Sequence, residues 1–343
     1  MRIMKMQYKF LEVFLESTAK YGAPYGPVRR NGVLTYDRVE KISDLVLSGE
    51  KTMIPAKKLF HPMRFDVFKF NEDGFTPDYS SIEKRVIIGL HPCEIHGLLK
   101  LDKIFDNPPA DPYYMGQRKN SIIIGWSCAV CENGLCKSTG TDIVEEGFDL
   151  FFVDVGGFYL VWIGSSVGYD MIHEKEEFFE STVTRDDLKA YVDWRAKRDS
   201  SFMKSFNFRN MPDIMDMSYQ SPIWEYFANK CISCGQCSMV CPTCNCYNIT
   251  DHFDVSNAST GRRERYWDSC MYMEYSLVAG GHNFRASRAD RLKLWYTHKL
   301  KTFGSQYAKP GCVGCGRCVD TCPVDINVLT VSEALTTGEV PKK

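Results

Sequence analysis

The chain has 343 residues, which fits two domains of ordinary size better than one. Its residues are 44% hydrophobic and 25% charged, and the net charge of -1 provides no overall attraction for nucleic acid or an anionic membrane. No apolar run approaches the roughly 20 residues that a membrane span requires. Residues 10–17 fit one face of a helix better than the core of a signal peptide, so we expect a cytoplasmic protein with neither a membrane span nor a nucleic-acid partner.

Short apolar segments mark the expected strands of the first two-thirds of the chain. Residues 85–90 and 121–126 are continuous apolar runs, which are typical of strands buried on both faces. Residues 149–164 predict two further strands joined at Gly156–Gly157, as in a hairpin.

Helical segments alternate with these strands. Residues 91–105 have helical periodicity with Pro92 in the first turn, and residues 184–202 predict a helix with Thr184 as its N-cap and Asp187 at the capping-box position. Alternation of this kind predicts a mixed α/β domain, which we assign to residues 1–215.

The character of the chain changes at about residue 216. Strand patterns almost vanish, and cysteines, arginines and short helical segments replace them. We therefore predict that residues 216–343 form a mainly helical, ferredoxin-like domain after the α/β domain. A basic insertion lies within this domain, between the two cysteine strings. Its arginines would dock an acidic partner, compensate the charge of anionic clusters or lie on a solvated helix face. They are Arg262, Arg263, Arg265, Arg285, Arg288 and Arg291.

Two cysteine strings in this second part have the same spacing, C-x2-C-x2-C-x3-C-P. This spacing is typical of bacterial-type [4Fe–4S] ligation, in which three close thiolates hold one cluster and the fourth cysteine reaches the other cluster. Zinc is the alternative, but zinc ribbons use pairs of C-x2-C and need only four ligands. The predicted ligands are Cys231, Cys234, Cys237 and Cys322 for one cluster, and Cys312, Cys315, Cys318 and Cys241 for the other.

Four more cysteines follow the two apolar strands of the first domain. Loops at the carboxyl ends of adjacent parallel strands converge on one crevice, which would bring these thiols together. We therefore consider a third cluster, with small buried thiols as the alternative interpretation. The residues are Cys93, Cys128, Cys131 and Cys136.

Three cysteines remain outside these sets. We interpret Cys244, Cys246 and Cys270 as structural thiols beside a cluster, with a ligand exchange or a redox pair as the alternative. The chain has no G-x-G-x-x-G, P-loop or other nucleotide motif of familiar type, so we expect no flavin or nucleotide on it. Electrons from NAD(P)H would then have to enter through another subunit.

The chain resembles the electron-transfer subunit of anaerobic sulfite reductase and, equally, the β subunit of cytoplasmic sulfhydrogenases. The resemblance is specific over residues 229–326 and looser before them, and it rests on these segments: CISCGQCSMVCPTCNCYNITD, WDSC, VAGGHNFR, HK at 298–299, CVGCGRCVDTCP, YGP, GLHPCEIHGLLKLDKIF and CKSTGT. It implies an electron-relay subunit of an anaerobic oxidoreductase complex, which itself carries no catalytic residues. The implied partners are a flavin-binding subunit that oxidises NAD(P)H and a terminal subunit, either a sirohaem sulfite reductase or a nickel–iron hydrogenase.

Other functions remain as alternatives at this point. The chain would serve equally as the β subunit of a sulfhydrogenase or of a heterodisulfide-reductase-linked complex. A zinc-binding scaffold without a redox role, and a self-contained reductase with a substrate site near Cys93, belong to different classes.

Overall fold

The computed structural model describes residues 2–303 and 309–340. Its first half is built on an eight-stranded mixed sheet in the order β10-β1-β9-β8-β7-β6-β2-β3. The central strands β2, β6, β7 and β8 are parallel, and antiparallel strands extend the sheet on both sides. The strands are β1 (Arg2–Gln7), β2 (Ala23–Arg30), β3 (Val33–Arg38), β6 (Arg85–Leu90), β7 (Ser121–Trp126), β8 (Leu150–Asp154), β9 (Phe158–Ile163) and β10 (Phe179–Glu180).

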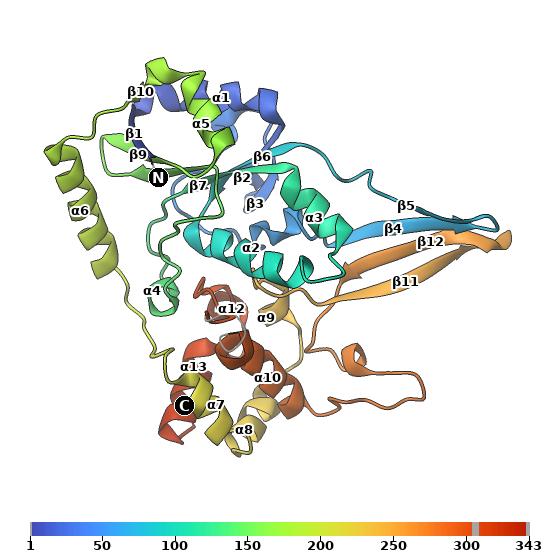
Figure 1. Cartoon of the computed structure of the whole chain (residues 1–343). Coiled ribbons are helices and arrows are strands. Elements are labelled where there is room, and N and C mark those ends of the chain that lie inside the picture. Colours follow the sequence, from blue (N-terminus) through green and yellow to red (C-terminus); the bar gives the residue numbers. More distant parts are fainter. Residues whose placement is uncertain (1, 304–308, 341–343) are drawn as a thin grey trace.

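Helices cover both faces of this sheet (Figure 1). Because side chains alternate along a strand, Ile88 of β6 packs with α1 and α5, whereas Ile87 packs with α2 and α3. Both faces of β6 are therefore buried, which explains its uninterrupted apolar sequence. The helices are α1 (Leu11–Ser17), α2 (Pro92–Phe105), α3 (Pro112–Lys119), α4 (Cys136–Thr139), α5 (Ser166–His173) and α6 (Arg185–Ser200).

The predicted elements of the first half are confirmed. Strands β8 and β9 form the expected antiparallel hairpin, with Gly156 and Gly157 at positive φ in its turn. At α6 the capping box is complete: the Asp187 amide donates to the Thr184 hydroxyl at 3.2 Å, and the Thr184 amide donates to the Asp187 carboxylate at 2.9 Å.

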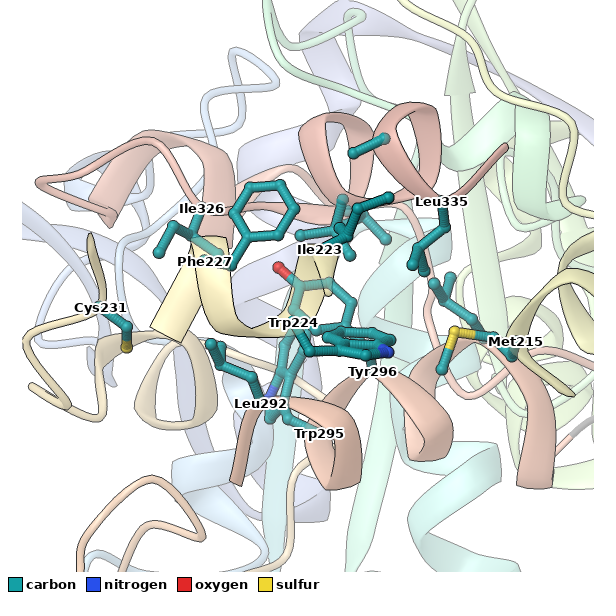
Figure 2. Packing of buried hydrophobic residues seen from close by; sticks show 14 of the residues in the cluster. Met215, Ile223, Trp224, Phe227, Cys231, Leu292, Trp295, Tyr296, Ile326 and Leu335 are labelled. Carbon is teal, nitrogen blue, oxygen red and sulfur yellow. The ribbon is translucent and has the colours of Figure 1, made fainter. Parts of the chain in front are cut away.

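Helices of the second half surround a core of their own (Figure 2). Trp224 and Phe227 from α8 are buried against Trp295 and Tyr296 from α10, and Leu335 from α13 closes the cluster. These helices are α7 (Met211–Met217), α8 (Ile223–Lys230), α9 (Gln236–Met239), α10 (Arg288–Thr297), the π-helical turn η7 (His298–Thr302), α12 (Arg317–Thr321) and α13 (Val328–Thr337). Short 3-10 turns are η1 (Tyr8–Phe10), η2 (Thr18–Tyr21), η3 (Ile42–Asp44), η4 (Ala56–Leu59), η5 (Glu176–Phe178) and η6 (Glu274–Ser276).

The description of the second half as mainly helical is not confirmed, because much of the basic insertion is a long β-hairpin. Strands β11 (Tyr247–Asp254) and β12 (Asn257–Trp267) join β4 (Arg64–Asn71) and β5 (Gly74–Pro77) from the first half in a four-stranded sheet. Figure 1 shows this sheet as an arm that extends away from both halves.

These strands were not recognised in the sequence because β12 is polar and basic. Two of its arginines are paired with carboxylates across the sheet: Arg263 bonds Asp251 of β11 at 2.7 Å, and Arg262 lies 3.2 Å from Asp66 of β4. Cross-strand pairs of opposite charge stabilise a sheet but leave no apolar alternation to detect. Arg262, Arg263 and Arg265 therefore lie on a strand and not on a solvated helix face.

In the part of the chain that the structure describes, no helix has the length and apolar character needed to cross a bilayer.

Candidate iron–sulfur sites

The first site is a cavity lined by four thiols from both cysteine strings. Two come from the loop that leads into α9, the third from α9 itself, and the fourth is the C-cap of α12. Cys234 is exposed, whereas Cys231 is buried, so one side of this site reaches the surface. The structure thus brings together the predicted set, site 1: Cys231, Cys234, Cys237 and Cys322.

The loops of the two strings have the same backbone conformation. Ser233 and Gly314, at equivalent positions, have φ of 56° and 59°, and Gly235 and Gly316 have φ of 75° and 74°. The Ser233 amide donates to the Cys231 sulfur at 3.4 Å, and the Gly314 amide donates to the Cys312 sulfur at 3.3 Å. Amide donors aimed at sulfur stabilise a thiolate, as ligands of an iron–sulfur cluster require.

The second site is built from the second string and the last cysteine of the first. Burial, with the neighbouring thiols of Cys315 and Cys241, raises the pKa of Cys312 to about 12. Burial and the same neighbours raise the pKa of Cys318, which also lies close to Cys237 of site 1. These four thiols, site 2, are the predicted set: Cys312, Cys315, Cys318 and Cys241.

The third site lies where β6 and β7 end. These strands are adjacent and parallel, so the first turn of α2 and the loop after β7 meet at one edge of the sheet. Burial and the thiol of Cys131 raise the pKa of Cys128 to about 12. The cavity, site 3, is lined by the predicted residues Cys93, Cys128, Cys131 and Cys136, and Cys315 of site 2 also lines it.

The donor sets fit [4Fe–4S] clusters. In sites 1 and 3 four thiols line one partly open cavity, as ligation of a cubane with four iron corners requires. Among residues 2–303 and 309–340, no three histidine, cysteine or acidic side chains converge on a point where a single ion would sit. Because the raised pKa values keep Cys128 and Cys312 protonated at neutral pH, binding of iron there releases protons.

Comparison with known proteins agrees with this geometry. Residues 230–326 match the family described as a 4Fe-4S dicluster domain. The whole chain is similar to sulfhydrogenase 2 subunit beta of Pyrococcus furiosus, with 37% identity over 338 residues, which cover 98% of this chain and 99% of the relative.

The chain belongs to the sulfhydrogenase β-subunit family. The dicluster match supports two [4Fe–4S] clusters in the second half, and this member of the family is an iron–sulfur electron-transfer subunit of an oxidoreductase complex. The resemblance inferred from the cysteine strings is thus confirmed.

Sequence reasoning missed a buried ion pair between sites 2 and 3 of this family member. The Arg317 guanidinium on α12 bonds the Glu94 carboxylate on α2, and the two side chains are 2% and 1% exposed. Arg317 also donates to the Thr52 carbonyl at 2.8 Å. Each residue stands beside predicted cluster ligands in the sequence, which could have drawn attention to the pair. Arg317 lies within the second cysteine string, where the first string has Gln236, and Glu94 follows Cys93.

Two buried lysines near site 2 were also missed. Burial opposes the charge of Lys299, but the neighbouring Cys241 and Cys244 raise its pKa overall. Lys57 donates to the Cys244 carbonyl at 2.9 Å and to the Ser238 carbonyl at 3.3 Å. With a cluster bound at site 2, the positive charge of Lys299 would offset the negative charge of the ligand thiolates, whereas burial lowers the pKa of Lys57.

Gly316 is expected to be essential to the contact between sites 2 and 3. An alanine Cβ there would lie 2.1 Å from the Asn133 carbonyl oxygen, whereas the same change at Gly338, also at φ +74°, meets nothing within 4 Å. We expect Gly338→Ala to lower the free energy of unfolding by about 1 kcal/mol, and Gly316→Ala by about 3 kcal/mol or more. The measurement is anaerobic denaturant titration. An equal decrease in the free energy of unfolding for both variants would show that the close approach of Gly316 to the Asn133 carbonyl does not matter.

Proposed function

We propose that this chain relays electrons through three adjacent [4Fe–4S] clusters, with site 2 in the middle. The ligands are the three sets of four thiols defined above. When bound, each cluster supplies one-electron redox chemistry. The observation that carries the proposal is the position of site 2: Cys318 lies close to Cys237 of site 1, and Cys315 lines the cavity of site 3.

The chain's own residues hold the three sites in a fixed relation. Loop residues of site 3 pack directly on the second string, where the Leu135 amide donates to the Gly314 carbonyl at 2.6 Å and the Thr141 hydroxyl donates to the Val313 carbonyl at 2.7 Å. Lys51 bonds both the Cys315 carbonyl, at 3.2 Å, and the Asp320 carboxylate. Such contacts keep the thiols of sites 2 and 3 close together.

Charge around site 2 would affect its reduction potential. Arg317 and Lys299 are buried cations close to thiols of this site. A nearby positive charge favours the reduced, more negative state of a cluster, so we expect site 2 to have a higher potential than it would in a neutral protein.

We further propose that the chain connects a flavin-binding subunit that oxidises NAD(P)H with a terminal catalytic subunit in a cytoplasmic complex. The sulfhydrogenase relative favours a hydrogenase over a sirohaem sulfite reductase as the terminal subunit. The exposed Cys234 and Ile232 put site 1 at the surface, where a partner's cofactor can approach. We expect no flavin on this chain.

Replacement of Cys128 by serine tests the third cluster. Loss of a thiolate ligand should lower the iron content of the anaerobically purified chain from about twelve to about eight per chain. The matched control is Cys246→Ser, which lies outside the three sets and should keep about twelve. Elemental analysis and electron paramagnetic resonance of the reduced proteins give the measurement, and unchanged iron in Cys128→Ser would disprove the assignment of site 3.

A further inference from the structure

A pocket beside site 2 contains thiols that the relay does not use. It has a volume of about 270 Å³ and lies between α10, η7 and the base of the β11–β12 hairpin. Its walls include Cys244, Cys246 and Cys270, together with the Lys299 side chain. A relay needs twelve thiols for three clusters, so these three require another explanation.

The hairpin holds Cys246 and Cys270 side by side. Tyr247, the first residue of β11, pairs with Trp267, the last residue of β12. The ladder continues outward, since the Asp268 amide donates to the Cys246 carbonyl at 3.1 Å. Cys270 follows two residues later, so an antiparallel pairing of segments more than twenty residues apart brings the two thiols together.

The two thiols differ in environment. Cys270 is 3% exposed, whereas Cys246 is only partly buried at the pocket wall. Hydrogen bonding from Cys270, and also from Tyr275, lowers the pKa of Cys246 to about 6. Cys246 is thus suited to attack as a thiolate, with Cys270 behind it as the resolving thiol.

The pocket also has a fixed positive charge. The Lys299 ammonium is buried and donates to the Thr243 hydroxyl at 2.7 Å, and both residues line the pocket. A buried cation in the wall favours an anion in the adjacent space. The ring of Trp295 provides an apolar surface on the same wall.

We propose that Cys246 and Cys270 form a redox-active dithiol that reduces a small anionic disulfide bound in this pocket. The Cys246 thiolate attacks one sulfur of the substrate and releases the first thiolate, which leaves a mixed disulfide on Cys246. The Cys270 thiol then attacks the Cys246 sulfur and releases the second thiolate. The protein gains one disulfide; the proton of Cys270 goes to one product thiolate, and solvent protonates the other.

The dithiol is restored by two electrons and two protons. A cluster bound at site 2 would supply the electrons, and this step alone rests on the proposed function. The Cys241 and Cys244 side chains contact each other, so the pocket wall adjoins a ligand of site 2. Reduction of the substrate itself needs only the two protein thiols and can be tested without a partner subunit.

The experiment uses the anaerobically purified, iron-loaded full chain and two probes of equal length and opposite charge. These are the dianion 3,3′-dithiodipropionate and the dication cystamine. We expect one Cys246–Cys270 disulfide and two released thiols per chain, found by peptide mass spectrometry. The dianion should react on the order of tenfold faster than the dication, and Lys299→Met should remove this preference.

Variants separate the roles of the two thiols. Cys270→Ser should trap one mercaptopropionate on Cys246, and Cys246→Ser should trap none, with iron content unchanged in both. Loss of iron in either variant would mean that these cysteines are metal ligands and would overturn the dithiol. Unreacted Cys246 in iron-loaded wild-type protein would also overturn it while leaving the relay intact. Absence of iron from the wild type would instead contradict the proposed function.

Discussion

Cys318→Ser is expected to interrupt the relay at its middle site. The thiol is enclosed by Cys312, Cys315 and Cys241, and Cys237 of site 1 lies close to it. Serine is a poor ligand for iron, so the iron content should fall from about twelve to about eight per chain. Sites 1 and 3 would then be separated by an empty site, and NAD(P)H-driven turnover of the assembled complex should fall to background.

The variant Cys128→Ser, which should lose the cluster of site 3, is the control for the loss of turnover in Cys318→Ser. Both variants should lose about four iron atoms, but only Cys318→Ser removes the site that adjoins both of the others. Electron paramagnetic resonance of the dithionite-reduced chain should show which signals persist and whether they still interact. Turnover that survives in Cys318→Ser after loss of its iron would contradict a middle position for site 2.

Removal of the Arg317 guanidinium is expected to have the largest effect on stability. In Arg317→Met the buried Glu94 carboxylate loses its charged partner and keeps the neutral Ala56 amide, at 3.0 Å. Leaving one member of a buried pair uncompensated costs about 3–5 kcal/mol in free energy of unfolding. The double variant Arg317→Met/Glu94→Leu should recover most of that loss, because it leaves no buried charge.

An exposed ion pair provides the control. Arg29 and Glu50 are 2.7 Å apart, but their side chains are 49% and 52% exposed. Arg29→Met should therefore change the free energy of unfolding by less than about 1 kcal/mol. The measurement is anaerobic denaturant unfolding, and redox titration gives a second result: loss of the cation should shift the midpoint of site 2 to a more negative potential. A double variant no more stable than Arg317→Met would rule out the unpaired carboxylate as the cause.

Sequence patterns predicted four of the eight strands of the first sheet, β6 to β9, with good boundaries, and missed β1, β2, β3 and β10. Residues 85–90 and 121–126 form β6 and β7 as predicted, because a strand buried on both faces must be apolar throughout. The cap at Thr184 was also predictable, since a capping box needs only residues three positions apart. The domain limits at residues 1–215 and 216–343 remain a prediction.

The β11–β12 hairpin was not predictable from local pattern. Its strands bury little apolar surface and are paired through charged side chains with β4, nearly two hundred residues earlier in the chain. The antiparallel pairing within the hairpin brings Cys246 to Cys270, whose relation in the sequence shows no motif. Arg317 and Glu94 were missed for the same reason, since they are 223 residues apart.

By itself, the sequence determined the chemistry of this protein: the repeated spacing of thiols selects iron–sulfur ligation, because ligands with two residues between them are held by the conformation of one short loop. Only the tertiary structure decided how the three sets of thiols adjoin one another, which cations lie against them and which cysteines remain beside an open pocket. Those relations arise from packing between segments far apart in the chain, where burial and charge compensation, not local spacing, set the geometry.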